Sequence, residues 1–244
     1  MAVKGEKINN KTLDQGLFIM GVMLCWELLA RTQWFPPLLF PSLTDVLRTL
    51  GSDISSGEIM GRLKFSLYLI AIGLGLAIIS AVLATILALC SPLFSNWVQA
   101  VMTILHPLPG IAILPIIILW LGTGPQSIIA VIWFSSVWPL ITNLHTGLRS
   151  VPMTQIEVGR NLGFKGVALI RRVLLPGAFP HVLAGLRVAW ARAWQASVAA
   201  EMVFGASGGE GGLGWFIYKK RFFMDIPSVF GGLVVIIIVG LIVE

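Results

Sequence analysis

The side chains of this chain that could do chemistry lie in unusually apolar surroundings. Arg192 and Glu201 share one apolar stretch, and His106 lies in another, directly before the sequence Pro107-Leu108-Pro109-Gly110. An ionisable group in such a stretch is costly unless it faces water, a partner or the interior of a helix bundle. Prolines break helices, and non-helical backbone at membrane depth is tolerated only inside protein or beside a wet cavity. The pattern therefore predicts a polar pathway. Its candidate residues are His106, Pro109, Arg192 and Glu201.

Arg192 and Glu201 have different expected roles. If their helix begins near residue 182, Arg192 lies about 15 Å along it, close to the bilayer midplane, where a guanidinium costs at least about 2.5–3.5 kcal/mol. Arg192 either attracts anions or has a structural partner, such as backbone carbonyls freed by the prolines, Glu27 or water. Glu201 lies on the opposite helical face. It either snorkels to the interface or accepts backbone N–H bonds from the glycine-rich segment 205–214, as part of an outer gate.

An intramembrane enzyme is one alternative. It would need a serine–histidine pair, two aspartates or an H-E-x-x-H pattern at membrane depth. The three histidines (His106, His145 and His181) have no metal-ligand spacing, and no aspartate lies inside an apolar stretch. We therefore assign no catalytic residue and no metal site. A passive channel subunit is the other alternative.

Composition defines the setting of these residues. Of 244 residues, 57% are hydrophobic and 11% are charged, whereas soluble domains carry about 25% charged residues. These figures exclude a soluble globular enzyme and a disordered chain, and they predict an all-α polytopic membrane protein surrounded by lipid. The net charge of +6 indicates cytoplasmic loops and lipid headgroups, and nucleic acid is not expected as a partner.

Six apolar stretches are predicted to cross the membrane as helices, because a crossing takes about 20 apolar residues. They are residues 17–30, 65–90, 97–121, 127–148, 182–204 and 229–243. Two carry small residues at helical spacing, which predicts close helix–helix seams; these are Gly73, Ala77 and Ala81, and then Gly185, Ala189, Ala193 and Ser197. The expected organisation is an N-terminal anchor helix with an outer loop, residues 1–63, followed by a core of five spans, residues 64–244.

The hydrophilic segment 149–181 lies on the same side as the N-terminus if all six stretches cross. Thr154 and Glu157 have the spacing of a capping box, which predicts the start of a short helix. Gly163 would end that helix as a left-handed cap, and Gly159 would allow close contact on one face. A second short helix, residues 167–175, is predicted to end at Pro176. Such a pair could dock into another protein or lie on lipid headgroups.

Four residues of this segment have the spacing of a known motif. Glu157, Gly163, Leu175 and Pro176 match the pattern E-A-A-x3-G-x9-I-x-L-P, with small or apolar residues at its other positions. The loop therefore resembles the cytoplasmic "EAA" loop of permeases of binding-protein-dependent ABC importers. Further stretches are similar to the nitrate/sulfonate/taurine branch of that family; they are residues 107–109, 114–115, 118–124, 147–151, 185–187 and 200–202.

The resemblance implies a type I ABC importer permease in a bacterial inner membrane, with cytoplasmic coupling helices and about six transmembrane helices. It implies import of a small anionic solute such as nitrate, sulfonate or taurine by alternating access. The implied partners are a second permease copy in a homodimer, two cytoplasmic ATPase subunits and an extracytoplasmic substrate-binding protein. The ATPase-docking residues would be Thr154, Glu157, Gly159, Gly163, Leu175 and Pro176.

The resemblance also places the cofactors. ATP and Mg²⁺ would be held by the ATPase subunits and not by this chain, which agrees with its lack of a G-x-x-x-x-G-K-[ST] phosphate loop. Such permeases usually continue into a basic cytoplasmic tail, whereas this sequence ends at Glu244. A truncated chain would explain that difference and the weak charge bias between the two sides.

Overall fold

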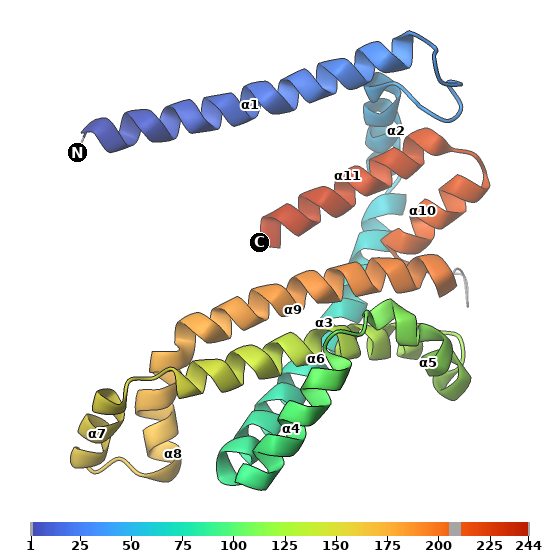
Figure 1. Ribbon diagram of the computed structural model, residues 1–244. Coiled ribbons are helices and arrows are strands. Elements are labelled where there is room, and N and C mark those ends of the chain that lie inside the picture. The colour runs from blue at the N-terminus through green and yellow to red at the C-terminus, as the bar shows by residue number, and fades with distance from the viewer. Residues whose placement is uncertain (1, 205–210, 244) are drawn as a thin grey trace. The chain divides into compact units, whose positions relative to one another are not determined.

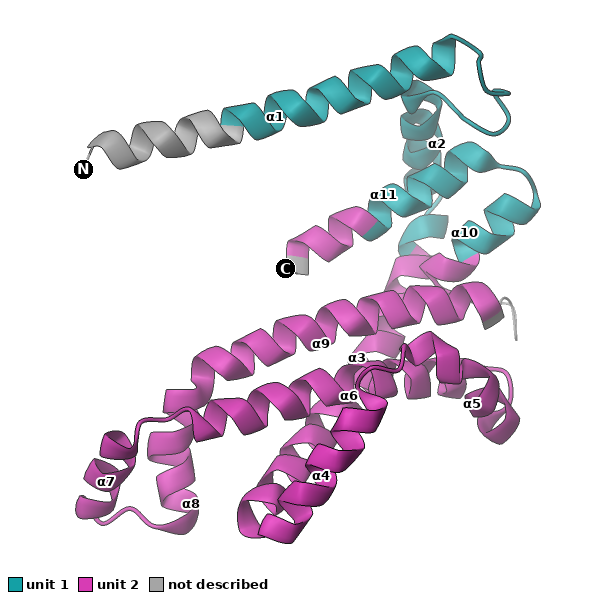
Figure 2. Ribbon diagram, in the orientation of Figure 1, with its two compact units in different colours: residues 1–60, 216–236 teal, residues 61–215, 237–244 magenta. Residues whose placement is uncertain are grey.

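The computed structural model describes residues 2–204 and 211–243, with side chains for residues 13–203 and 211–242. Every regular element in these residues is a helix, so the predicted all-α class is confirmed. The chain forms two compact units, which are described separately (Figure 2). The first contains Met1–Met60 and Phe216–Ile236, and the second contains Gly61–Trp215 and Ile237–Glu244.

Five of the six predicted apolar stretches are helical throughout, and the third is interrupted at residues 106–109. Four described helices are long and apolar enough to cross a membrane; they are Leu13–Arg31 within α1 (Ala2–Arg31), α3 (Glu58–Cys90), α6 (Pro125–Arg149) and the helix Gly166–Val203. The third predicted span is a broken pair, which would be a fifth crossing. The last stretch is the shorter helix α11 (Ile226–Val243).

The prolines break the third predicted span as expected. Helix α4 (Pro92–Leu105) ends before them, and a 3-10 turn, η1 (Gly110–Ile113), leads into α5 (Leu114–Leu121). The two parts are bent by 89°. Pro109 is extended, with φ −60° and ψ 130°, and so lies outside any helix.

Helices α6 and α9 (Leu175–Phe204) run side by side and form the centre of the second unit (Figure 1). Both small-residue seams are confirmed. A Cβ on Gly185 would lie 2.7 Å from Cβ of Asn143 on α6, and one on Gly73 would lie 2.6 Å from Cγ2 of Ile132. Ala189 and Ala193 are fully buried. The backbones therefore approach more closely than larger residues would allow.

The first unit ties the end of α1 to the chain that follows it. The indole nitrogen of Trp26 donates to the Pro41 carbonyl oxygen at 3.0 Å. The Glu27 carboxylate pairs with Arg31 at 2.8 Å, and it accepts hydrogen bonds from the Leu43 amide at 2.8 Å and the Thr44 hydroxyl at 3.0 Å. Glu27 therefore has partners within its own unit.

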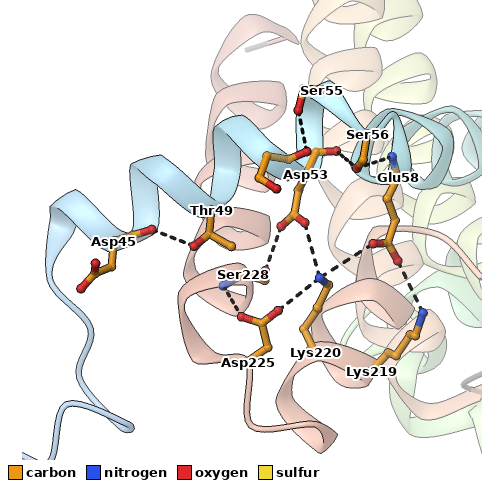
Figure 3. Close-up of polar contacts among 11 residues, drawn as sticks. Asp45, Thr49, Asp53, Ser55, Ser56, Glu58, Lys219, Lys220, Asp225 and Ser228 are labelled. Carbon is orange, nitrogen blue, oxygen red and sulfur yellow. Dashed lines mark hydrogen bonds and ion pairs between the residues drawn. The ribbon is translucent and has the colours of Figure 1, made fainter.

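An ion network joins α2 (Leu43–Ser55), α10 (Leu213–Phe222) and α11 within the first unit (Figure 3). Nζ of Lys220 lies 3.4 Å from Asp53, 3.8 Å from Glu58 and 3.2 Å from Asp225. The Ser228 hydroxyl donates to the other oxygen of Asp53 at 2.9 Å. Asp53 is buried, so removal of these partners would leave a buried carboxylate without a cation.

The pKa values of Lys220 and Asp225 determine the pH range over which this network stabilises the fold. Burial lowers the pKa of Lys220, but the hydrogen bond to Asp225 and three carboxylate charges outweigh it and raise that pKa above its ordinary value. Burial raises the pKa of Asp225, but its bonds to Ser228 and Lys220 outweigh that and lower it. The stabilisation is therefore complete between the ordinary pKa values of aspartate and lysine. It is lost as pH falls through the folded pKa of Asp225 or rises through that of Lys220.

Lys220→Met is expected to lower the free energy of unfolding by on the order of 2 kcal/mol, because it leaves Asp53 buried without its cation. Lys219→Met is the matched control, since among the described residues its ammonium pairs with Glu58 alone, at 3.5 Å, and its side chain is 39% exposed. The control should cost under about 1 kcal/mol. Thermal unfolding of the detergent-solubilised chain at neutral pH measures both, and equal losses would contradict a central role for Lys220.

Candidate functional site

A cavity of about 200 Å³ lies where the broken third span meets α6 and α9. Three of the predicted pathway residues, His106, Pro109 and Arg192, line this one cavity. Leu108, Gly110 and Ile111 complete the contribution of the proline-containing stretch, residues 106–115, which was expected as a lining. The rest of the wall was not predicted; it consists of Ser135, Trp138, Pro139, Gln195, Ala196 and Ala199. Gln195 follows Arg192 by one helical turn, so a search for polar neighbours at helical spacing would have found it.

The break in the third span shapes one side of this cavity. His106 caps the end of α4, and η1 begins at Gly110, which lies so close to α6 that a Cβ there would collide with the Ser135 hydroxyl. That hydroxyl donates to the Val131 carbonyl oxygen at 2.8 Å, so its oxygen can still accept a hydrogen bond. The bent backbone therefore brings the polar groups of three segments around one space.

Arg192 extends from the middle of a longer helix than expected. Helix α9 begins at Leu175 instead of near residue 182, and Arg192 lies about 18 Å from its Phe204 end. The guanidinium is exposed in the single chain and has no hydrogen-bond or ion-pair partner among the described residues. Backbone carbonyls freed by the prolines, which were one of the expected structural partners, are therefore not bonded to Arg192 among the described residues.

A second, wider cavity of about 650 Å³ lies beside the first. Arg192 and Gln195 line both cavities, and Arg187, Trp190 and Trp194 contribute to the wider one. Among the described lining residues, every side chain that can carry a charge is basic: His106, Arg187 and Arg192. In a low-dielectric wall, the two arginines concentrate anions.

Two tryptophans in these walls have unusual indole groups. Nε1 of Trp138, in the narrow cavity's wall, and Nε1 of Trp190, in the wider one's, are buried without a hydrogen-bond partner among the described residues. A buried donor without an acceptor costs about 1–3 kcal/mol and calls for a physical reason.

Glu201 belongs to a separate cluster. It is 1% exposed, so it does not snorkel to an interface. One carboxylate oxygen accepts from the Ser197 hydroxyl and the other from the Ser66 hydroxyl and the Gly214 amide, all at 2.9 Å. The Ser66 oxygen in turn accepts from the Leu213 amide at 2.9 Å. The expected backbone bond is confirmed at Gly214, while residues 205–210 of the glycine-rich segment lie outside the described residues.

The capping-box prediction for the segment 149–181 is wrong. Helix α7 (Met153–Asn161) begins after Pro152, which occupies the cap position without a side-chain hydrogen bond. Thr154 is therefore the second helical residue and cannot serve as the cap, since a cap residue has non-helical torsions. Thr154 and Glu157 are both exposed on this helix and are free to contact a partner.

The end of α7 is as predicted. Gly163 has φ +83°, its amide donates to the Arg160 carbonyl at 2.9 Å, and the Phe164 amide donates to the Gly159 carbonyl at 3.0 Å. These two bonds are the Schellman motif, which favours glycine at this position. Close packing at Gly159 is also confirmed, since a Cβ there would lie 2.6 Å from Cγ2 of Val173.

The second loop helix does not end at Pro176, which corrects that prediction. Helix α8 (Gly166–Leu169) continues through a π-helical turn, η2 (Ile170–Leu174), directly into α9. Pro176 is the second residue of α9. Proline has no amide hydrogen to donate, and the wider π turn before it accommodates this without ending the helix. Leu175 and Pro176 are exposed there. One continuous helical segment thus runs from the loop to Arg192.

Comparisons with known proteins agree on the class of protein. Residues 73–244 match the family described as "Binding-protein-dependent transport system inner membrane component". The "Putative aliphatic sulfonates transport permease protein SsuC" of Bacillus subtilis is 30% identical over 93% of this chain and 81% of its own length. The taurine transport system permease protein TauC of Escherichia coli is 27% identical over 91% of this chain and 82% of its own length.

Solved structures show the same fold. The MetNI methionine ABC transporter, in inward-facing conformations, matches 76% of this chain and 90% of its own chain with a TM-score of 0.64 at 18% identity. The family match covers well over half of the sequence, and the apolar helices agree with it. The chain belongs to the binding-protein-dependent ABC transporter permeases: it is a non-catalytic, multi-pass inner-membrane subunit of an importer that works with an ATPase and a substrate-binding protein.

Proposed function

We propose that this permease imports a small anionic organic solute through the cavity lined by His106, Pro109 and Arg192. The observation that carries the proposal is the charge of the walls, because every described side chain there that can carry a charge is basic. The permeases for aliphatic sulfonates and taurine are relatives across nearly the whole chain, which supports an organic sulfonate as the solute class.

Two copies of the chain enclose the pathway, and two ATPase subunits, which hold ATP and Mg²⁺, bind on the cytoplasmic side. The exposed residues of the docking loop contact the ATPases; they are Thr154, Glu157, Leu175 and Pro176. Gly159 and Gly163 instead shape the loop from within. The continuous segment from α8 to α9 supports a direct mechanical route, because a push on the loop moves the helix that carries Arg192.

Glu201 acts as part of the outer gate in this proposal. Its carboxylate fixes the start of α10 to α3 and α9 through Gly214 and Ser66. When the outer ends of the spans separate, these hydrogen bonds keep the start of α10 together with α3 and α9.

Arg192→Gln should reduce the initial rate of ATP-driven uptake of an aliphatic sulfonate by about tenfold or more, because one charge-assisted contact to the solute is lost. Arg192→Lys should retain part of the activity, since the charge remains but the bidentate geometry does not. The control is Arg48→Gln, an equal loss of charge at an exposed position of α2.

Uptake is measured in proteoliposomes that contain the complete importer, normalised to the amount of inserted complex. Full transport by Arg192→Gln would overturn the anion pathway. Loss of thermal stability in Arg192→Gln with unchanged apparent affinity for the sulfonate would assign Arg192 a structural role instead.

A further inference from the structure

The wider cavity contains a second arginine that the proposed pathway does not use. We propose that Arg187 and Arg192 are two successive anion stations along α9, with Arg187 the station from which the solute leaves toward the cytoplasm. This inference rests on the proposed function. It adds a second binding position for an oxyanion group, in a different cavity.

The two arginines line one cavity at different heights of the same helix. They are five residues apart on one helix, a rise of about 7.5 Å. Arg192 lines both cavities, whereas Arg187 lines only the wider one. Arg187 is the nearer of the two to Leu175, where α9 joins the docking-loop helices. An anion bound at Arg192 therefore reaches Arg187 by moving toward the cytoplasmic end of α9.

The charges of the two cavities suit transfer rather than storage. No described acidic side chain lines the wider cavity to neutralise Arg187. Two weak positions that share an ion allow it to enter and to leave, whereas one deep position would trap it. Gln195 lines both cavities as well and can donate to an oxyanion at either position.

The unpartnered indole groups are a second, independent observation. One lies in each wall, Trp138 in the narrow cavity and Trp190 in the wider one, and each has a buried nitrogen without an acceptor among the described residues. A ligand with several acceptor oxygens would satisfy such donors when the helices shift.

The test uses trifluoromethanesulfonate, a small sulfonate whose ¹⁹F signal broadens on binding. The permease–ATPase complex is placed in nanodiscs of phosphatidylcholine, without the binding protein. We expect saturable broadening, with the apparent affinity weakened about tenfold or more in both Arg187→Gln and Arg192→Gln. Arg187→Lys should stay within about threefold of the native complex, and Arg48→Gln should be unchanged.

The outcomes separate the two proposals. Native affinity in Arg187→Gln together with weakened affinity in Arg192→Gln would overturn the second station and leave the pathway standing. Native affinity in both variants, or no binding to the native complex, would overturn both. An effect of Arg187→Gln that appears only with phosphatidylglycerol in the disc would assign Arg187 to lipid headgroups. Dissociation of the permease dimer by Arg187→Gln would assign it to the subunit interface. Either result would overturn the second station.

Discussion

Glu201→Ala is expected to abolish transport while the chain still inserts into the membrane. The substitution removes the acceptor for the hydroxyls of Ser66 and Ser197 and for the Gly214 amide, all of them buried. Each unpaired buried donor costs about 1–3 kcal/mol. Three donors lose their acceptor here, so the start of α10 is released from α3 and α9. Uptake and thermal stability of the inserted complex measure the effect.

Glu201→Gln is the matched variant, because it keeps the shape of the side chain and one acceptor oxygen. It should retain measurable uptake and lose less stability than Glu201→Ala. Ser197→Ala removes only one of the three bonds and should be milder still. Equal transport defects in Glu201→Gln and Glu201→Ala would count against the clamp.

Gly159→Leu is expected to separate the permease from its ATPase. Even the first added carbon would lie 2.6 Å from Cγ2 of Val173 and 3.0 Å from Cδ1 of Leu169, so α7 must move away from α8 and η2. Overpacking of this kind costs typically about 1–3 kcal/mol and changes the shape of the docking loop. We expect the ATPase subunits to be lost during co-purification of the inserted permease.

Val158→Leu controls for a larger side chain in the same turn, because Val158 is 58% exposed and has room to grow. It should co-purify with the ATPase at the native ratio. If Gly159→Leu also retained the ATPase and normal uptake, the segment 149–181 would not be the docking site.

The sequence predicts those features of the fold that depend on local chemistry. The small residues of α9 mark its buried face, since only they allow the close approach to Asn143 and its neighbours on α6. Pro109 marks the break in the third span, and Gly163 marks the end of α7, because each residue has a backbone preference of its own. These features need no knowledge of distant residues.

The sequence does not predict features in which two local signals compete or in which residues far apart in the sequence meet. Thr154 and Pro152 both mark a possible helix start, and only the folded chain shows that the helix begins directly after Pro152. Pro176 normally ends a helix, but the π turn before it accommodates it. Gln195 and Trp138 become part of a site only where three segments meet.

The ion network also depends on residues that are far apart in the sequence. Asp53 and Lys220 are 167 positions apart, and neither lies in a sequence pattern that predicts an ion-pair partner. Ser66 and Glu201, the central pair of the proposed gate, are 135 positions apart. Contacts of this kind come from tertiary packing alone, which is why Glu201 was predicted as a gate residue without Ser66.

We propose that this chain couples ATP hydrolysis to the import of an anion. The most direct measurement is the ATPase rate of the complete importer in proteoliposomes, with its binding protein supplied first empty and then loaded with an aliphatic sulfonate. We expect the sulfonate-loaded binding protein to stimulate ATP hydrolysis severalfold, and we expect sulfonate uptake to require ATP. Sulfonate flux without ATP, or hydrolysis that ignores the loaded binding protein, would contradict it.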